Sequence, residues 1–409
     1  MRIQPRVMQA AQWALVVGFL LFPVAFALGN VFIALAFLLS LGAGAYRARW
    51  QGIRQIPVVW WALGLYAVVL LGLSYSPAPW EDARVPLSKY AKLLVLPALL
   101  SLLMEPAWRR RCMGAFMLGM GFILASVYAN VFWQLPWSTT QNLGWGKDHT
   151  VIGDYITQNV MMAFFVIASL SLAQRARDWR LRGLWWCLAL AAGVAVTQLS
   201  EGRTGYLLLI VAVATYVAFA LKGRLRWGVL AGLFLAIALA LATSTTVRER
   251  VELGVHEAMG SNSMATLTSI GGRVNFWRKT LEFISEKPVQ GWGTGNYHST
   301  WCSRVTELGW CWFGGWHPHN QYLFFWMENG LPGLLLYLLL VTSTAWAARH
   351  AAPVDRPLLW GFTAIFAVNS LINSPLFSGR ESHFFVMLLL LLSAQARWGG
   401  RPQQAPAGH

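Results

Sequence analysis

The sequence predicts an all-α, polytopic integral membrane protein with about twelve transmembrane helices and a small helical subdomain outside the membrane. The chain of 409 residues is 56% hydrophobic, 12% charged and contains 23 Trp, which is more apolar surface than a water-soluble core can hide. Apolar runs long enough to span ~30 Å of hydrocarbon also recur along the chain. These runs begin near Ala11, Asn30, Ile56, Ser88, Met113, Ile156, Gly183, Thr204, Trp227, Leu331, Pro357 and Ser382.

The connections between these runs differ in charge. With the amino terminus placed in the cytoplasm, the cytoplasmic segments hold more than half of the 32 Lys and Arg residues but only three of the 16 acidic ones. Because cytoplasmic loops of membrane proteins are enriched in Lys and Arg, both termini are predicted to be cytoplasmic in a multi-pass plasma-membrane protein. The net charge of +16 then reflects topology and contact with anionic membrane lipids, and it does not imply nucleic-acid binding.

Four segments follow from this pattern. Residues 1–244 are predicted to hold nine spans, residues 245–320 an outer loop subdomain, residues 321–396 three more spans, and residues 397–409 a cytoplasmic tail. Within the loop, residues 246–259 and 273–286 have the spacing of amphipathic helices. Pro288 should end the second helix, and the glycine-rich residues 291–296 should form a tight loop. The first span also resembles a signal peptide, but another span begins directly after it, so we expect it to be retained.

The cysteines fall into two groups. Cys302 and Cys311 lie in one predicted outer loop, where an oxidising compartment favours a disulfide, and two buried thiols are the alternative. Cys112 and Cys187 are expected to be packing residues.

Basic residues gather at predicted membrane-proximal positions on the outer side. Arg203 opens the eighth span, Lys89 lies one helical turn from Lys92, and Arg273 follows two glycines at a predicted helix start. Free backbone N–H groups at a helix start favour an anion. Such cations predict a site for a membrane-borne diphosphate, while side chains that merely reach lipid headgroups are the alternative.

A second candidate feature is the pair His317 and His319. Pro318 suits a first helical turn, so His319 should lie at a helix amino terminus, where the dipole keeps the ring neutral as a general base requires. The alternatives are ordinary hydrogen-bonded rings or a metal site formed by the two histidines, for which no further ligand is evident. Asp148 and Asp154 could also hold Mg²⁺.

Four short motifs stand out in the second half of the chain: Arg203-Thr204-Gly205, Gly291-x-Gly293-x-Gly295-Asn296, His319-Asn320-x-Tyr322-Leu323 and Glu328-x-Gly330-Leu331-x-Gly333. Together they resemble the O-antigen ligase family of lipopolysaccharide biosynthesis. Its superfamily also includes the Wzy-type O-antigen polymerases and the bacterial protein O-oligosaccharyltransferases. One departure is Gly202, where the family more often has Ser before Arg-Thr-Gly.

The resemblance implies a metal-independent, inverting glycosyltransferase of the GT-C type without a cofactor. Such an enzyme transfers a glycan from undecaprenyl diphosphate to a sugar hydroxyl of lipid A–core at the periplasmic face of the inner membrane. His319 would be the base, and Arg203, Arg273 and Lys89 would bind the diphosphate. Supporting roles would fall to Asn320, Tyr322, Asn296, Glu328 and His317.

Three other functions stay open. A polymerase would use a second lipid-linked glycan as acceptor, and a protein oligosaccharyltransferase would use Ser or Thr but usually carries an extra carboxy-terminal region. A non-enzymatic anion or lipid transporter would show two related halves and charged or broken helices at mid-membrane depth. The ionisable residues here cluster at the outer interface instead.

Overall fold

The structure, a computed structural model, describes residues 4–243, 269–305 and 310–399. These residues form helices and turns, and no strand occurs among them. The predicted amphipathic helix at residues 246–259 lies outside the described residues. The helices are α1 (Pro5–Val24), α2 (Phe26–Gly42), α3 (Tyr46–Ile53), α4 (Pro57–Gly72), α5 (Trp80–Tyr90), α6 (Lys92–Leu100), η1 (Ser101–Leu103), α7 (Pro106–Asn130), α8 (Tyr155–Arg175), α9 (Trp179–Gln198), α10 (Arg203–Ala220), α11 (Gly223–Thr243), α13 (Ser269–Glu286), α14 (Asn296–Arg304), α15 (Trp310–Gly314), α16 (Gln321–Ala348), α17 (Arg356–Ile372) and α18 (Gly379–Trp398).

Each of the twelve predicted apolar runs coincides with a helix, but the expected count of about twelve spans is not met. Within the described ranges, seven helices are long and apolar enough to cross a membrane, or eight if α2 and α3, bent by 119°, count as one. The physical reason lies in length and polarity. Helices α4 and α17 have 16 and 17 residues, or roughly 25 Å at 1.5 Å per residue, and α18 begins with polar residues.

The core is built from apolar helices that share aromatic contacts. Helix α8 is the most enclosed of the candidate spans, with 89% of its apolar 18-residue stretch buried inside the protein. Phe164 of α8 packs against Phe116 of α7, Phe362 of α17 and Phe384 of α18, with ring centroids 5.8 Å apart in each pair. Large apolar side chains such as Leu118 stay exposed on the outside, as expected where lipid is the solvent.

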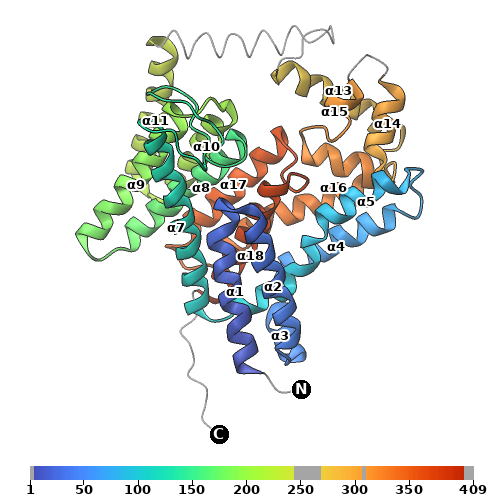
Figure 1. Ribbon diagram of the computed structural model, residues 1–409, viewed down its shortest axis with the longest axis horizontal. Coiled ribbons are helices and arrows are strands. Elements are labelled where there is room, and N and C mark those ends of the chain that lie inside the picture. The colour runs from blue at the N-terminus through green and yellow to red at the C-terminus, as the bar shows by residue number, and fades with distance from the viewer. Residues whose placement is uncertain (1–3, 244–268, 306–309, 400–409) are drawn as a thin grey trace.

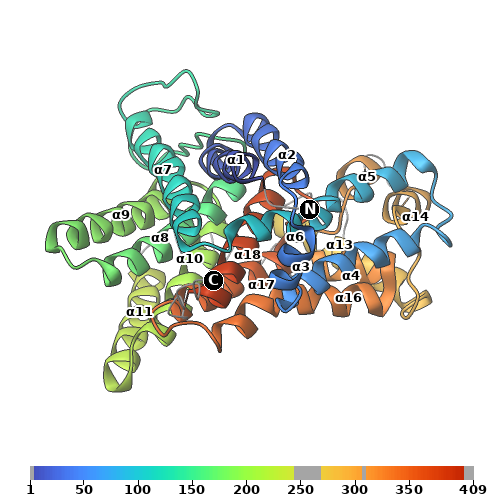
Figure 2. The ribbon, with the colours of Figure 1, turned by 90° about the horizontal axis from the view of Figure 1, so that it is seen from below.

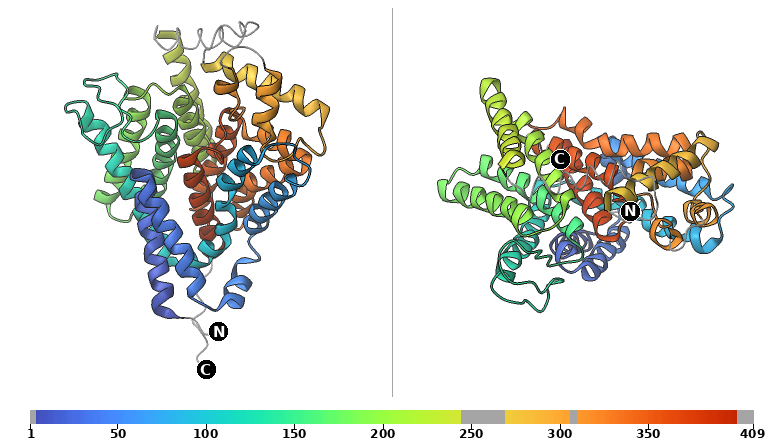
Figure 3. Two further views of the ribbon diagram at one scale, coloured as in Figure 1. Left: turned by 45° about the vertical axis from the view of Figure 1, so that its right-hand side comes forward. Right: turned by 90° about the horizontal axis from the view of Figure 1, so that it is seen from above.

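The two sets of loops that differ in charge lie at opposite ends of the molecule. Figure 1 shows both termini at one end and α13, α14 and α15 at the other, and Figure 3 shows the same separation from a second direction. At the end that holds the termini, also seen in Figure 2, Arg175 pairs with Asp355 and the Arg109 side chain donates to Gln395 (3.3 Å).

The connections predicted on the outer side also contact one another. The Ser299 hydroxyl donates to Asp82 (2.8 Å), which joins α14 to α5. The His149 amide donates to the Leu199 carbonyl (3.0 Å), which joins the loop before α8 to the end of α9. The contacts therefore group the loops as the charge pattern does.

Helix α16 is broken where the sequence predicts that its membrane span begins. Gly330 has φ 62° and ψ −160°, so the residues before and after it form two helical segments. The glycine-rich loop fills this break: Trp292 and Gly293 donate their amides to the carbonyls of Met327 and Glu328 (2.8 Å each), and the Leu331 amide donates to the Val289 carbonyl (3.0 Å). The backbone groups that the break releases are therefore paired, as a low-dielectric setting demands.

Candidate active site

His319 lies directly before α16 in a strained conformation. Its φ of 50° falls in the left-handed region, which a non-glycine residue rarely adopts. The backbone amide of His319 donates to Nδ1 of His317 (3.2 Å), and its carbonyl accepts from the Trp277 indole of α13 (3.4 Å). The imidazole stacks on Phe276 at 5.8 Å between ring centroids. Strain held by surrounding contacts is typical of functional positions.

The helix starts later than predicted. Helix α16 begins at Gln321, and the N-cap is Asn320, whose side chain accepts from the Leu323 amide (3.1 Å). Pro318 and His319 therefore precede the helix, and the prediction that Pro318 occupies its first turn is wrong. The imidazole therefore lies next to the helix start but outside the first turn.

The imidazole of His319 is nevertheless held in its neutral form. Burial, and then the positive charge of Arg273, lower the pKa of this ring, whereas a side-chain hydrogen bond with Asn373 raises it. The resulting pKa is about 4. The predicted neutrality thus has burial as its main cause. Nδ1 of this ring is buried and has no hydrogen-bond partner within the described residues.

Arg273 lies beside His319, one turn inside α13. The helix begins at Ser269, four residues earlier than the sequence predicts. The prediction that Arg273 lies at a helix start is therefore wrong. Burial lowers the pKa of its guanidinium, while Tyr155 and Glu381 raise it. Its Nε is buried without a hydrogen-bond partner among the described residues. A buried cation with an unsatisfied N–H group can bind an anionic oxygen at this position.

Arg203 is the first residue of α10, as predicted, with Gly202 as the N-cap. A Cβ on Gly202 would lie 2.7 Å from Nδ2 of Asn159 and 2.9 Å from the ring of Tyr155, so Ser at this position would require a shift of these side chains. Tyr155 also interacts with Arg273. The Arg203 helix start and Arg273 therefore share Tyr155 as a neighbour.

Lys89 and His317 belong to the same cluster. The ammonium group of Lys89, in the last turn of α5, lies 5.7 Å from the centroid of the Phe377 ring, and His317 packs on the same ring at 5.6 Å. Burial, followed by the charges of His319, Arg273 and Lys89, lowers the pKa of His317 well below its usual range. Arg273, Lys89 and His317 thus lie close enough to His319 to form one electrostatic cluster with it.

The other predicted supporting residues contact the scaffold. The Glu328 carboxylate, buried in α16, accepts from the backbone amides of Gly295 and Tyr297 (3.3 Å to Tyr297) at the start of α14. Asn296 donates to the Thr300 hydroxyl (3.1 Å), and Tyr322 donates to the Ala367 carbonyl of α17 (3.1 Å). These contacts give the three residues a structural role, joining the helices that surround the site.

Sequence reasoning missed the contribution of the segment between α17 and α18. Glu381 is buried and accepts from Asn373 (2.9 Å) and Asn369 (3.2 Å). The preceding residue, Arg380, has a buried Nη1 without a partner among the described residues. The sequence signal was a few polar residues within 373–381, between two apolar segments, but only the folded chain brings Glu381 beside Arg273.

The candidate metal ligands have other partners. Asp148 accepts from the Thr150 hydroxyl (2.9 and 3.1 Å), and Asp154 caps α8 by accepting from the Thr157 amide (2.9 Å) and hydroxyl (2.7 Å). Among the described residues, the group with metal-ligand spacing is His298, Cys302 and Cys311. The two cysteines of this group form a disulfide in the structure, the pairing that the sequence predicts.

The fold is that of a polytopic helical membrane protein, and the candidate site gathers cations around a neutral histidine. Residues 187–338 match the family model described as O-antigen ligase, so the resemblance stated from the motifs holds over just over a third of the chain. No curated protein matches the chain. The match supports a transferase of the O-antigen ligase or polymerase type, whose substrates are lipid-linked glycans in general.

Proposed function

We propose that the protein is an O-antigen ligase of the bacterial inner membrane. It transfers a polysaccharide from undecaprenyl diphosphate to a sugar hydroxyl of lipid A–core at the periplasmic face, with inversion at the anomeric carbon and without a metal ion. The observation that carries this proposal is the neutral imidazole of His319 beside the buried Arg273, each with a nitrogen that has no partner in the described part of the chain.

His319 acts as the general base in this proposal. A sugar hydroxyl is a weak nucleophile, so removal of its proton while its oxygen attacks the anomeric carbon lowers the barrier. A ring with a pKa of about 4 is available at neutral pH but is a weak base. A bound diphosphate places negative charge beside the ring and raises its pKa, because an opposite charge favours the imidazolium. The donor thereby strengthens the base that its reaction requires.

The cations act on the leaving group. As the glycosidic bond breaks, negative charge develops on undecaprenyl diphosphate, and fixed guanidinium groups stabilise this charge in the transition state. Arg273 is the central group in this proposal, and Arg203 and Lys89 assist it from other helices. Arg380, which was not a candidate from the sequence, is a fourth cation that can bind the leaving group. Their low-dielectric surroundings strengthen each interaction relative to water.

The main alternative is a Wzy-type O-antigen polymerase, since the matched family model covers ligases and polymerases alike. The same base and cations would serve a polymerase, and only the acceptor differs. A transporter is less well supported, because the ionisable groups of the cluster gather at one end of the helices and include a histidine whose neutrality suits proton transfer.

The experiment that tests the proposal compares cells with and without the protein. Loss of a ligase leaves polymerised glycan on undecaprenyl diphosphate and no ladder on lipid A–core, whereas loss of a polymerase leaves single repeat units. Complementation with His319→Ala should restore little transfer, since a positioned base contributes ~10²–10⁴-fold, and His317→Ala should be milder. Single repeat units in the deletion strain would favour the polymerase, and near-normal turnover of His319→Ala would refute the role of the base.

A further inference from the structure

A large cavity lies between five helices at the end of the molecule that holds the termini. It has a volume of about 910 Å³, at the upper end of the ~300–1,000 Å³ typical of ligand sites. It lies among α7, α8, α9, α17 and α18 and takes no residue from the cluster around His319.

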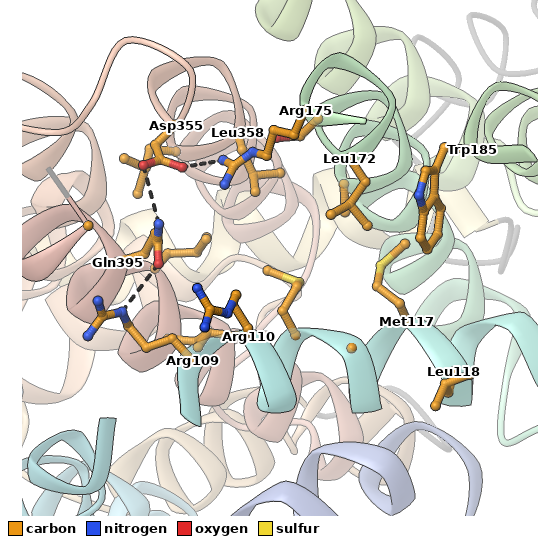
Figure 4. A pocket seen from close by; sticks show the side chains of 18 of the residues that line it. Arg109, Arg110, Met117, Leu118, Leu172, Arg175, Trp185, Asp355, Leu358 and Gln395 are labelled. Atoms are coloured by element: carbon orange, nitrogen blue, oxygen red, sulfur yellow. Dashed lines mark hydrogen bonds and ion pairs between the residues drawn. The ribbon is translucent and has the colours of Figure 1, made fainter. Parts of the chain in front are cut away.

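The lining of this cavity is divided into a polar and an apolar part. Figure 4 shows Arg109, Arg110, Asp355 and Gln395 gathered at one side, with Leu358 between Asp355 and Arg175, and apolar side chains toward the other side. The apolar side chains labelled there include Met117, Leu118, Leu172 and Trp185. An occupant therefore needs a charged head and an apolar body.

The polar end carries a positive excess. Gln395 accepts from Arg109 (3.3 Å) and donates to Asp355 (3.3 Å), and Asp355 also pairs with Arg175. The lining residues thus include three guanidinium groups and one carboxylate. Arg109 also donates to the carbonyls of Leu103 and Met104 (2.8 and 2.7 Å), whereas Arg110 is exposed. Complementary charge on an occupant is therefore negative.

The apolar end is open along α7. A Cβ on Gly114 or Gly121 would meet nothing within 4 Å, so these glycines leave a channel along the cavity wall. Next to them, Leu118 is 70% exposed, which places the mouth of the channel on the lipid-facing surface. Acyl chains can enter such a channel sideways from the bilayer.

We infer that this cavity binds an anionic phospholipid of the cytoplasmic leaflet, with its phosphate at Arg110 and an acyl chain along Gly114 and Gly121. Basic pockets between transmembrane helices on the cytoplasmic side are suited to anionic headgroups. The positive-inside arrangement predicted from the sequence puts this end in the cytoplasm. The undecaprenyl diphosphate of the proposed reaction has its headgroup at the opposite end, so it is not the ligand inferred here.

The test uses purified full-length protein, stripped of lipid in detergent and titrated with phosphatidylglycerol or phosphatidylcholine while native mass spectrometry counts bound lipid. We expect phosphatidylglycerol to bind more tightly. Arg110→Gln should weaken its binding about fivefold, the effect of one basic residue near a membrane surface. The matched control is Arg111→Gln: this neighbour stacks over Trp108 at 4.4 Å and does not line the cavity.

A second pair of variants tests the acyl channel. Gly121→Leu should lower lipid occupancy by filling the channel, whereas Gly183→Leu, also in open space but outside the cavity, should not. Thermal unfolding confirms that each variant is folded. Equal affinity for the two lipids, equal weakening by both arginine variants, or unchanged occupancy in Gly121→Leu would overturn the inference.

Discussion

The low pKa of His319 makes a quantitative prediction for the proposed base. A base with a pKa of about 4 is about 90% neutral at pH 5, whereas an imidazole with the ordinary pKa of 6.5 is about 3% neutral at that pH. Because only the neutral ring accepts a proton, kcat/KM should stay nearly constant from pH 8 to pH 5 and fall as the pH drops through about 4. The profile of kcat, which reports the complex with donor, should fall at a higher pH.

The assay measures glycan transfer by protein in nanodiscs at low donor concentration across this range. Arg273→Gln removes a positive charge that lowers the pKa of His319, so its residual activity should lose kcat/KM at a higher pH than the parent protein. His317→Gln is the control and should keep the acid limb of the parent. A kcat/KM profile that halves near pH 6.5 in the parent protein would refute the assignment of the neutral, buried ring.

Four further predictions concern the arginines, metal removal, the disulfide and the break in α16. Arg273→Ala and Arg203→Ala should abolish transfer in a folded protein and Lys should rescue poorly, because it lacks the bidentate fork; normal ligation by both Ala variants would contradict this. Transfer should survive EDTA, and a loss that Mg²⁺ reverses would return attention to Asp148 and Asp154. Mass mapping of unreduced protein should find Cys302 bonded to Cys311, not two alkylated thiols. Gly330→Ala should lower the free energy of unfolding by at least about 1 kcal/mol, because φ is positive there and an added Cβ would lie 2.0 Å from the Val289 carbonyl oxygen. Gly121→Ala, in open space, should not, and equal melting temperatures would argue against this.

The elements of the fold were predictable where apolar length decided them. Helix α10 starts at Arg203 as expected, whereas the break in α16 at Gly330 was not predicted. The number of spans was not predictable in the same way. A run of apolar residues does not reveal that the chain bends by 119° between α2 and α3.

The sequence predicted which residues lie together in the candidate site better than it predicted why they do so. His319 and Arg273 do lie together, but both helix starts that were used to choose them lie elsewhere, and burial sets the neutrality of His319. Arg380 and Glu381 were missed because their neighbours, Asp154, Tyr155 and Arg273, are distant in sequence. Such long-range proximity leaves no periodic signal in a single chain.

The backbone pairing across the break in α16 also limits how the site can open. Residues 289–293 share amide–carbonyl bonds with Met327, Glu328 and Leu331, and Glu328 holds the start of α14. Pulling this loop away would leave several backbone groups unpaired near lipid, each at a cost of several kcal/mol. These bonds therefore tie the loop to the first segment of α16, which follows His319. In the proposed reaction, His319 is thus held by a rigid support while the acceptor binds.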